Sequence, residues 1–427
     1  MNEQESFCTL NWPGKEQARL QAAAPSAMVM EELPGCGRDR ESTGNIFIEG
    51  DNLDSLKLLL PEYREQVSLV YIDPPYNTGH RFAYKDSFRS KRAPAAEQHA
   101  NWCSMMYPRL RLAFELLSPG GALFISLDDR ELGQLRLLCD EICGEDNFVA
   151  QLVWETKREA KGIPPRTMCI INHEYVIVYA KSRSFSFKGE MRQASDGFHN
   201  PDDDPKGPWK RQYLQRFGQG FPQRELRNPD NGMVFRFETP YTEEKMNAWL
   251  AEGAIIFPLS PNRFPARKEY FCRYKNPYKP VLSSWGLYST KTNSEKLKAL
   301  FDRNKCFDYP KPTALMQRLV EQACPPDGIV LDLFAGSGTT AHAVMQQNAA
   351  DGGRRRCISL QTAEELAEDA PARRLGYTNI CEVCAARLRK AADLLLAERI
   401  DSDPVDLDVG FRYYRLVSRE DMQSGQH

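Results

Sequence analysis

The chain has 427 residues, too many for one compact core, so about two or three domains are expected. Its 41% hydrophobic, 27% charged and 10% aromatic residues are typical of a globular protein and exclude a disordered or fibrous chain. The net charge of −2 gives no argument of its own for a polyanionic partner. Because the first residues are polar and no apolar run is long enough for a membrane helix, we expect a cytoplasmic protein with no membrane segment.

The first half of the chain alternates predicted strands and helices. Residues 1–44 lack sustained periodicity and are predicted to form an irregular N-terminal arm. The elements expected after it are a strand at 45–49, a helix from Leu53, a buried strand at 67–72, a helix at 102–117, a strand at 122–127, a helix at 131–142 and a strand at 175–180. This order predicts a doubly wound α/β sheet, with its first part at 45–182.

The chain changes character over residues 183–305, where loops, Pro, Gly, Arg and aromatic residues dominate. Residues 183–283 hold 17 Lys and Arg and 12 Asp and Glu, a balance of +5, so the remainder of the chain carries −7. The strand pattern resumes at 328–331 and 356–360, which defines a second α/β part at 306–427. We therefore predict a basic domain inserted into a split sheet. Its candidate contacts to a nucleic acid, each of which could instead be a solvated surface group, are Trp209, Lys210, Arg211, Arg216, Arg224, Arg227 and Arg236.

A glycine-rich turn follows the strand expected at 328–331, where residues 331–340 read LDLFAGSGTT. A phosphate loop would need a lysine before the Ser/Thr, and a dinucleotide fold would need three spaced glycines, so neither pattern fits. An acidic residue, an aromatic ring and two close glycines suit the amino-acid end of S-adenosylmethionine, although a simple tight connection is the alternative. The candidate cofactor-binding residues are Asp332, Phe334, Gly336, Gly338 and Thr339, with Glu364 after the next strand for the ribose hydroxyls.

A second motif, DPPYNTG at residues 73–79, follows the buried strand at 67–72, at the edge where open α/β sheets bind ligands. Pro74 and Pro75 have no N–H group, which leaves the Asp73 carboxylate and the Pro74 carbonyl as acceptors for an amine with two protons. Tyr76 could stack on a base lifted out of a duplex. Such acceptors would let an exocyclic amine attack a sulfonium methyl group directly, without a metal or a covalent intermediate. A turn that only ends the strand, with Asp as a cap, is the alternative.

Together the two motifs resemble those of the DNA amino-methyltransferases. Asp-Pro-Pro-Tyr first and Phe-x-Gly-x-Gly last is similar to the order of their β class, and the closest likeness is to the modification subunits of type III restriction systems. The resemblance implies a circularly permuted, Rossmann-like sheet that binds S-adenosylmethionine, an inserted target-recognition domain, and methylation of the N6 amine of adenine in double-stranded DNA. It also implies that Asp51 meets the cofactor's adenine and Lys311 its carboxylate. A helix cap and a solvated charge are the alternatives for these two residues.

The resemblance further implies a homodimer and, as a candidate partner, a restriction subunit. Asp at the head of the tetrapeptide favours adenine, but the cytosine N4 amine is an alternative, as are an RNA or protein amine and a catalytically silent DNA-binding or partner-binding module. Methylation of the cytosine ring carbon is disfavoured because no cysteine follows a proline. The one Cys-x-x-Cys pair, Cys381 and Cys384, has no second pair at matching spacing and is expected to pack on a helix face rather than bind zinc.

Overall fold

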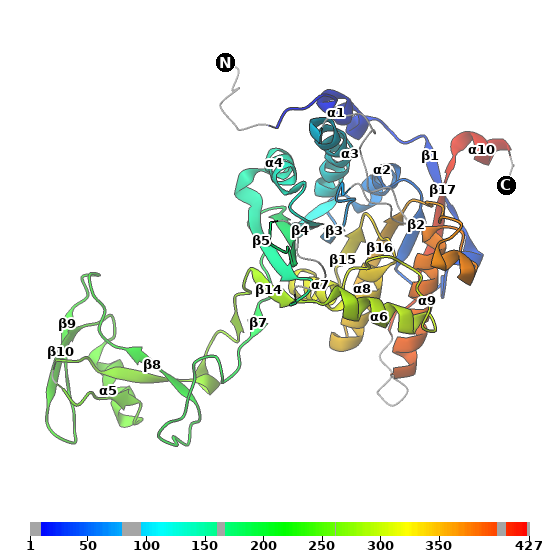
Figure 1. Ribbon diagram of the computed structural model, residues 1–427. Coiled ribbons are helices and arrows are strands. Elements are labelled where there is room, and N and C mark those ends of the chain that lie inside the picture. Colours follow the sequence, from blue (N-terminus) through cyan, green and yellow to red (C-terminus); the bar gives the residue numbers. More distant parts are fainter. Residues whose placement is uncertain (1–9, 79–94, 160–166, 261, 399–406, 425–427) are drawn as a thin grey trace, which may run out of the picture. The chain divides into compact units, whose positions relative to one another are not determined.

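The computed structural model describes residues 10–78, 95–159, 167–260, 262–398 and 407–424 (Figure 1). The chain forms two compact units, which we call unit 1 (Met1–Lys188 and Leu282–His427) and unit 2 (Gly189–Val281). In the described part of the chain, none of the helices has the length and apolar character needed to cross a membrane.

Unit 1 is built on a mixed sheet of ten strands, in the order β1-β17-β2-β16-β15-β3-β4-β6-β5-β14. From β17 to β4 neighbouring strands run parallel, whereas β1 and β6 are antiparallel to their neighbours. In sheet order the strands are β1 (Met28–Glu32), β17 (Arg412–Ser418), β2 (Ile46–Glu49), β16 (Arg356–Gln361), β15 (Ile329–Asp332), β3 (Val67–Ile72), β4 (Leu117–Leu127), β6 (His173–Ala180), β5 (Phe148–Glu155) and β14 (Ser284–Leu287). The predicted α/β sheet is confirmed, while its description as a circular permutation stays a prediction.

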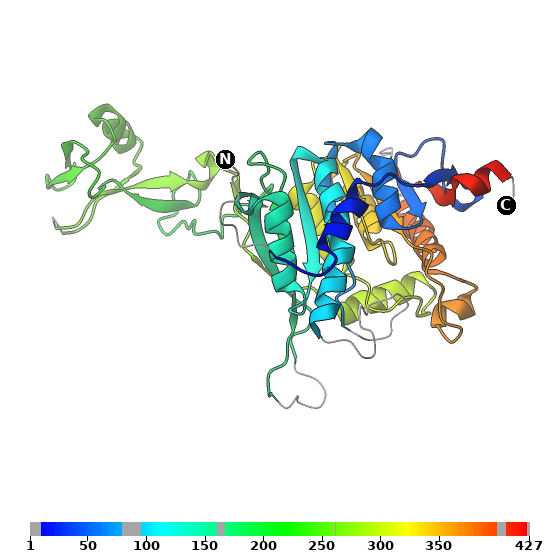
Figure 2. The same ribbon diagram turned by 90° about the horizontal axis from the view of Figure 1, so that it is seen from above.

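Helices cover both faces of this sheet (Figure 2). Alternate residues of a strand point to opposite faces, so Val70 lies in one apolar cluster and Leu69 in the other. The first cluster includes residues of α1 (Lys15–Ala23), α2 (Asn52–Tyr63), α3 (Ala95–Leu116) and α4 (Leu132–Cys143). The second includes residues of α7 (Thr313–Ala323), α8 (Thr339–Asp351) and α9 (Ile380–Glu398).

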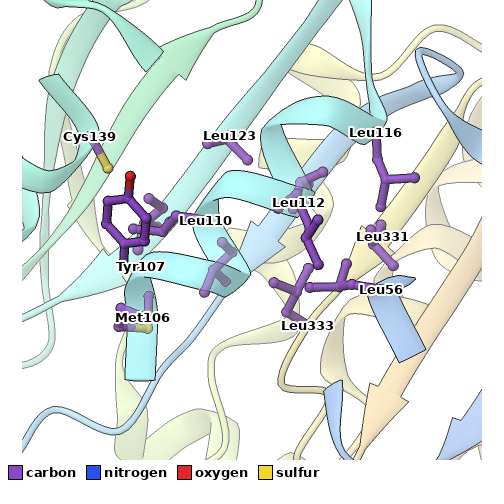
Figure 3. Close-up of a cluster of buried hydrophobic side chains, with 14 of the residues drawn as sticks. Leu56, Met106, Tyr107, Leu110, Leu112, Leu116, Leu123, Cys139, Leu331 and Leu333 are labelled. Atoms are coloured by element: carbon purple, nitrogen blue, oxygen red, sulfur yellow. The ribbon is translucent and has the colours of Figure 1, made fainter. Parts of the chain in front are cut away.

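Part of the first cluster surrounds Leu331 and Leu333 of the glycine-rich motif. Figure 3 shows Leu112 and Leu116 of α3 beside Leu56 of α2 and the side chains of Leu331 and Leu333. All five side chains are buried, with at most 4% of their surface exposed. The segment that leads into the glycine-rich turn is therefore anchored by core packing on this face.

Two further helices complete unit 1: α6 (Thr290–Leu300), and α10 (Arg419–Ser424), which follows β17. Leu297 of α6 lies in a small cluster with Ile380 and Val383 of α9. Short 3₁₀ turns lie at Pro34–Cys36, Glu145–Asn147 and Pro371–Leu375.

Unit 2 consists of short antiparallel elements around small apolar clusters. One cluster contains Leu214, Leu226, Phe235 and Met246. The first and last strands of unit 2, β7 (Glu190–Met191) and β13 (Tyr278–Lys279), pair with each other. Its other elements are the three-stranded sheet of β11 (Ile255–Ile256), β12 (Ala266–Tyr270) and β8 (Trp209–Tyr213), the hairpin of β9 (Gln223–Arg227) and β10 (Val234–Glu238), the helix α5 (Glu243–Ala251), and a 3₁₀ turn at Phe271–Arg273.

Two predictions about chain organisation need correction. The arm predicted to be irregular over residues 1–44 contains α1 and β1, and β1 pairs with β17 at the sheet edge. Neither element has a clear apolar pattern in the sequence, because Ala18 is the buried residue of α1 and no residue of β1 is fully buried. The insertion predicted at 183–305 is the compact unit 189–281, since β14 pairs with β5 and α6 packs in unit 1.

Candidate active site

Two turns meet at one edge of the sheet in unit 1. Their strands, β3 and β15, are parallel neighbours in which Asp332 pairs with Tyr71. The Leu333 N–H donates to the Tyr71 carbonyl at 3.1 Å, so the chain after β15 stays beside the end of β3. Tyr76 and Phe334 pack against the same apolar cluster. The structure thus brings together the two motifs that the sequence places more than 250 residues apart.

The first turn, residues 73–77, has charged contacts on the side that faces Lys311 and Glu174, which we call its front. The Lys311 Nζ lies 3.0 Å from Asp73 Oδ1 and 3.4 Å from Glu174 Oε2. The same ammonium lies 4.7 Å from the centroid of the Tyr76 ring, and the Tyr76 hydroxyl donates to Glu174 Oε2 at 3.2 Å. Glu174 belongs to β6, and Lys311 precedes α7. Two segments that are distant in sequence, β6 and the stretch before α7, therefore converge on this turn.

The electrostatics of this cluster favour an ionised lysine and a neutral tyrosine. Burial acts to lower the pKa of Lys311, but the charges of Asp73 and Glu174 outweigh burial and hold it well above its usual value. Burial, helped by the charge of Asp73, raises the pKa of Tyr76 well above that of a free phenol. Tyr76 is therefore a hydrogen-bond donor with an uncharged ring.

The back of the same turn is held by buried hydrogen bonds. Asn77 has a left-handed backbone with φ of 58°, a conformation that asparagine tolerates better than most residues. Its Nδ2 donates to Glu131 Oε1 at 2.7 Å, and His99 Nδ1 lies 2.8 Å from the same oxygen. The indole of Trp102 donates to the Pro75 carbonyl at 2.7 Å. The turn thus has a fixed backbone as well as a charged front.

The second turn follows β15 and depends on glycine. Gly338 has φ of +79°, and a Cβ atom there would lie 2.8 Å from Cys384 Sγ, so a side chain would both strain the backbone and displace α9. The N–H of Gly336 donates to Gln361 Oε1 at 2.7 Å. Asp332, which precedes the turn, is buried, and this burial raises its pKa to about 7. Its Oδ1 accepts the backbone N–H of Phe334 at 3.1 Å.

A buried guanidinium supports the second turn from below. Arg387 of α9 is 2% exposed, and its Nη1 donates to Ser337 Oγ and Thr339 Oγ1, each at 2.7 Å. Its Nη2 donates to Thr313 Oγ1 at 3.1 Å, and burial lowers the pKa of Arg387 to about 10. The Thr339 hydroxyl, predicted to bind the cofactor, is thus engaged by Arg387. Cys384, one turn earlier on α9, and Cys381 are both buried in the core, as expected for helix-face packing.

The remaining predicted residues lie around these turns. Asp51 caps α2, since its Oδ1 accepts the Leu53 N–H at 2.8 Å, and it also pairs with Arg109 at 2.9 Å. Pro74 is buried, and Glu364 is half-buried just beyond the end of β16. Lys311, predicted near the cofactor's carboxylate, contacts Asp73 and Glu174 instead of standing as a solvated charge. Contact of Asp51, Glu364 and Lys311 with a cofactor stays a prediction.

Five of the residues that hold the two turns had no role predicted from the sequence. Two had a local signal: Asn77 directly follows the tetrapeptide, and Glu174 directly precedes the strand predicted at 175–180. The other three are Glu131, Trp102 and Arg387, whose partners are tens of residues away along the chain. No motif marks such residues, because only the fold brings them to the turns.

Comparison with known proteins places this site in a family. Residues 67–371 match the family described as DNA methylase. The StyLTI Mod subunit of a type III restriction-modification enzyme from Salmonella typhimurium is 33% identical, over 98% of this chain and 67% of its own length. The EcoPI Mod subunit from Escherichia phage P1 is 32% identical, over 90% of this chain and 68% of its own. The type II methyltransferase M.KpnI from Klebsiella pneumoniae is 28% identical, over 85% of this chain and 91% of its own.

These matches identify a methyl-transferring enzyme, and they cover both turns, which we call the acceptor turn (residues 73–77) and the glycine turn (within residues 331–340). The chain belongs to the DNA methylase family and is a DNA methyltransferase that uses S-adenosylmethionine.

Proposed function

We propose that the chain transfers a methyl group from S-adenosylmethionine to the N6 amine of adenine in a specific sequence of double-stranded DNA. The observation that carries this proposal is the acceptor turn, residues 73–77, at the end of a strand adjacent to the one that leads into the glycine turn. Asp at the head of the acceptor turn and the similarity to type III Mod subunits favour adenine over cytosine. The same similarity supports a role in restriction-modification.

The residues around the glycine turn fit S-adenosylmethionine. A Cβ atom at Gly338 would lie only 2.8 Å from Cys384 Sγ, and both glycines have a positive φ, so the turn needs residues without side chains. We propose that Asp332, Phe334, Gly336 and Gly338 hold the amino-acid end. Glu364 would hold the ribose and Asp51 would lie at the adenine, in keeping with their positions beyond β16 and β2. When bound, the cofactor supplies an electrophilic methyl group.

The acceptor turn explains how a poor nucleophile could react. The lone pair of an exocyclic amine is delocalised into the base, and acceptors for both amine protons concentrate it on nitrogen. The Asp73 carboxylate and the Pro74 carbonyl are such acceptors, and neither proline can offer a competing donor. The ring of Tyr76 would stack on the extruded base. Trp102 and Glu131 fix the turn from behind, which keeps the acceptors in position for attack.

Unit 2 is proposed as the target-recognition domain. On the β9–β10 hairpin, Leu226 and Phe235 point into the apolar cluster, while Arg227 and Arg236 are exposed on the opposite face. A two-stranded ribbon with exposed arginines suits the major groove of DNA. We also propose that the protein acts as a homodimer and accepts a restriction subunit. Light scattering, alone and with a co-expressed subunit, tests both assemblies.

The decisive experiment identifies the methylated base. Purified protein is incubated with DNA and S-adenosylmethionine, and the DNA is digested to nucleosides for mass spectrometry. The expected product is N6-methyladenine, absent from a parallel reaction with the Asp73→Ala variant. N4-methylcytosine would overturn the adenine assignment, and cofactor binding without any methylated base would favour a silent binding module. Single-molecule sequencing of the product then gives the recognition sequence.

A further inference from the structure

We propose that Lys311 is the counter-ion of a carboxylate pair, Asp73 and Glu174, and holds the Asp73 carboxylate in place so that it can accept a hydrogen bond from the target amine. This role rests on the proposed function, because it concerns the same acceptor turn. It makes Lys311 and Glu174 positioning residues for the reaction, a role that neither the motifs nor the comparisons assign to Glu174.

The geometry of the cluster supports this role directly. One ammonium lies within 3.4 Å of an oxygen of each carboxylate, and the Lys311 side chain is only 13% exposed. The side chains of Asp73 and Glu174 are 25% and 22% exposed, so water screens the pair only in part. Lys311 also lies over the Tyr76 ring. It therefore touches each of the three side chains at the front of the acceptor turn.

The backbone around Lys311 is fixed, which restricts the positions that its ammonium group can reach. Lys311 stands between Pro310 and Pro312, which restrict the chain on both sides. The buried amide of Asn293 donates to the carbonyls of Pro310 at 2.8 Å and of Lys311 at 3.0 Å. This anchoring separates Lys311 from an ordinary surface lysine, which loses conformational entropy when it forms an ion pair.

Removing the ammonium would change the chemistry of the turn. Two carboxylates that share one site repel each other, and one of them then takes up a proton. A protonated Asp73 carboxyl could donate a hydrogen bond where the amine requires an acceptor. Among the residues that the structure describes, the other titratable groups that act on this cluster are acidic or phenolic and cannot replace the lysine; they are Tyr71, Tyr76, Asp128 and Asp332.

The proposal differs measurably from a role at the cofactor. If Lys311 held the cofactor's carboxylate, replacing it would weaken cofactor binding at every pH. If it is the counter-ion of Asp73 and Glu174, cofactor affinity should be nearly unchanged and the pH dependence of methyl transfer should change. The loss should be greatest at low pH, where protonation of the pair is easiest.

The test uses the full chain with Lys311→Met, which keeps length and removes charge, and Lys311→Arg, which keeps charge. Single-turnover rates from pH 5.5 to 9 should fall about tenfold to a hundredfold in Lys311→Met at pH 6.5 and recover as the pH rises. Lys311→Arg should keep the profile of the parent protein. Affinity for S-adenosylhomocysteine, measured by calorimetry, should stay within about twofold. Lys188→Met, which removes an exposed lysine paired with Glu321, is the matched control.

A second variant guards against simple damage to the fold. In Lys311→Met with Glu174→Gln the repulsion is gone, and the glutamine oxygen can still accept from Tyr76. We expect this double variant to lose the pH dependence and to exceed Lys311→Met at pH 6.5. A double variant no better than Lys311→Met, or a tenfold loss of S-adenosylhomocysteine affinity in Lys311→Met, would overturn the proposal. Failure of the parent protein to methylate adenine would instead overturn the proposed function.

Discussion

The two turns at the sheet edge follow neighbouring parallel strands, yet they are held in opposite ways. Pro74 and Pro75 stiffen the backbone of the acceptor turn. Charged and polar side chains contact it on both sides, Lys311 on one and Trp102 on the other. The glycine turn has a backbone in left-handed conformations, with a buried arginine below it. The first arrangement fixes the positions of two hydrogen-bond acceptors, and the second is a tight turn whose backbone favours glycine. Two turns at one sheet edge are thus held by different means, polar side-chain contacts in one and backbone conformation with core packing in the other.

Loss of the acceptor itself should have the largest effect. Asp73→Ala keeps both prolines, so the turn should stay in place while methyl transfer falls about a hundredfold to a thousandfold. Single-turnover assays measure the rate, and calorimetry with S-adenosylhomocysteine should show unchanged affinity. Asp73→Asn, which keeps an acceptor oxygen without the charge, should fall between. Near-normal turnover in Asp73→Ala would refute its catalytic assignment.

Crowding the glycine turn should lower cofactor affinity, the quantity that Asp73→Ala leaves unchanged. In Gly338→Val the added atoms meet Cys384 and Leu388, so S-adenosylhomocysteine affinity should fall about tenfold to a hundredfold. Gly352→Val is the matched control, because Gly352 also has a positive φ, of +70°, but no atom lies within 4 Å of its added Cβ. The control should lose stability through backbone strain and keep its cofactor affinity. Equal affinities in the two variants would show that space at Gly338 does not matter.

The acid that precedes the glycine turn should make stability depend on pH. The pKa of Asp332 is about 7 in the folded protein, against about 3.9 in an unfolded chain. The folded state therefore holds this proton more tightly, and the stability it gives is complete below pH ~4 and is lost as the pH rises to ~7. Asp332→Asn cannot ionise. From pH 5.5 to 7.5 the parent should lose about 2 kcal/mol more unfolding free energy than the variant. Urea titrations measure this difference, and parallel curves would contradict it.

Loosening the acceptor turn from behind should have the smallest effect. Glu131→Gln keeps an oxygen for Asn77 and His99 but removes the charge that strengthens both hydrogen bonds. We expect methyl transfer to fall about tenfold, with cofactor affinity unchanged. Glu141→Gln, which changes an exposed glutamate of α4 paired with Lys15 at 2.7 Å, is the control. A normal rate in Glu131→Gln would mean that the prolines alone fix the turn.

The parts of the fold that could be predicted are those with local causes. The buried run at 67–72 and the strand at 328–331 are apolar in sequence, and a turn motif follows each. Because parallel strands end at the same edge, their meeting could be foreseen as well. The strand β1 could not, because its residues are half-buried and gain their strand partner from β17 near the other end of the chain.

The residues that support the site could not be predicted from the sequence, because their partners are also distant along the chain. Glu131 and Arg387 are single charged residues in otherwise ordinary helical sequence, and their burial results from packing between distant segments. Lys311 was found in the sequence, but its contacts with Asp73 and Glu174 depend on where β6 lies in the sheet. Motifs identify groups that do chemistry, while the groups that position them emerge only from the fold.

The strands β7 and β13 pair with each other where the chain enters and leaves unit 2, with Glu190 opposite Lys279. A folded segment whose entry and exit lie side by side can be exchanged for another by recombination at those two points, without cutting any strand of the large sheet. Under the role proposed for unit 2 in target recognition, such an exchange would change the target sequence and leave the methyl-transfer residues of unit 1 unaltered.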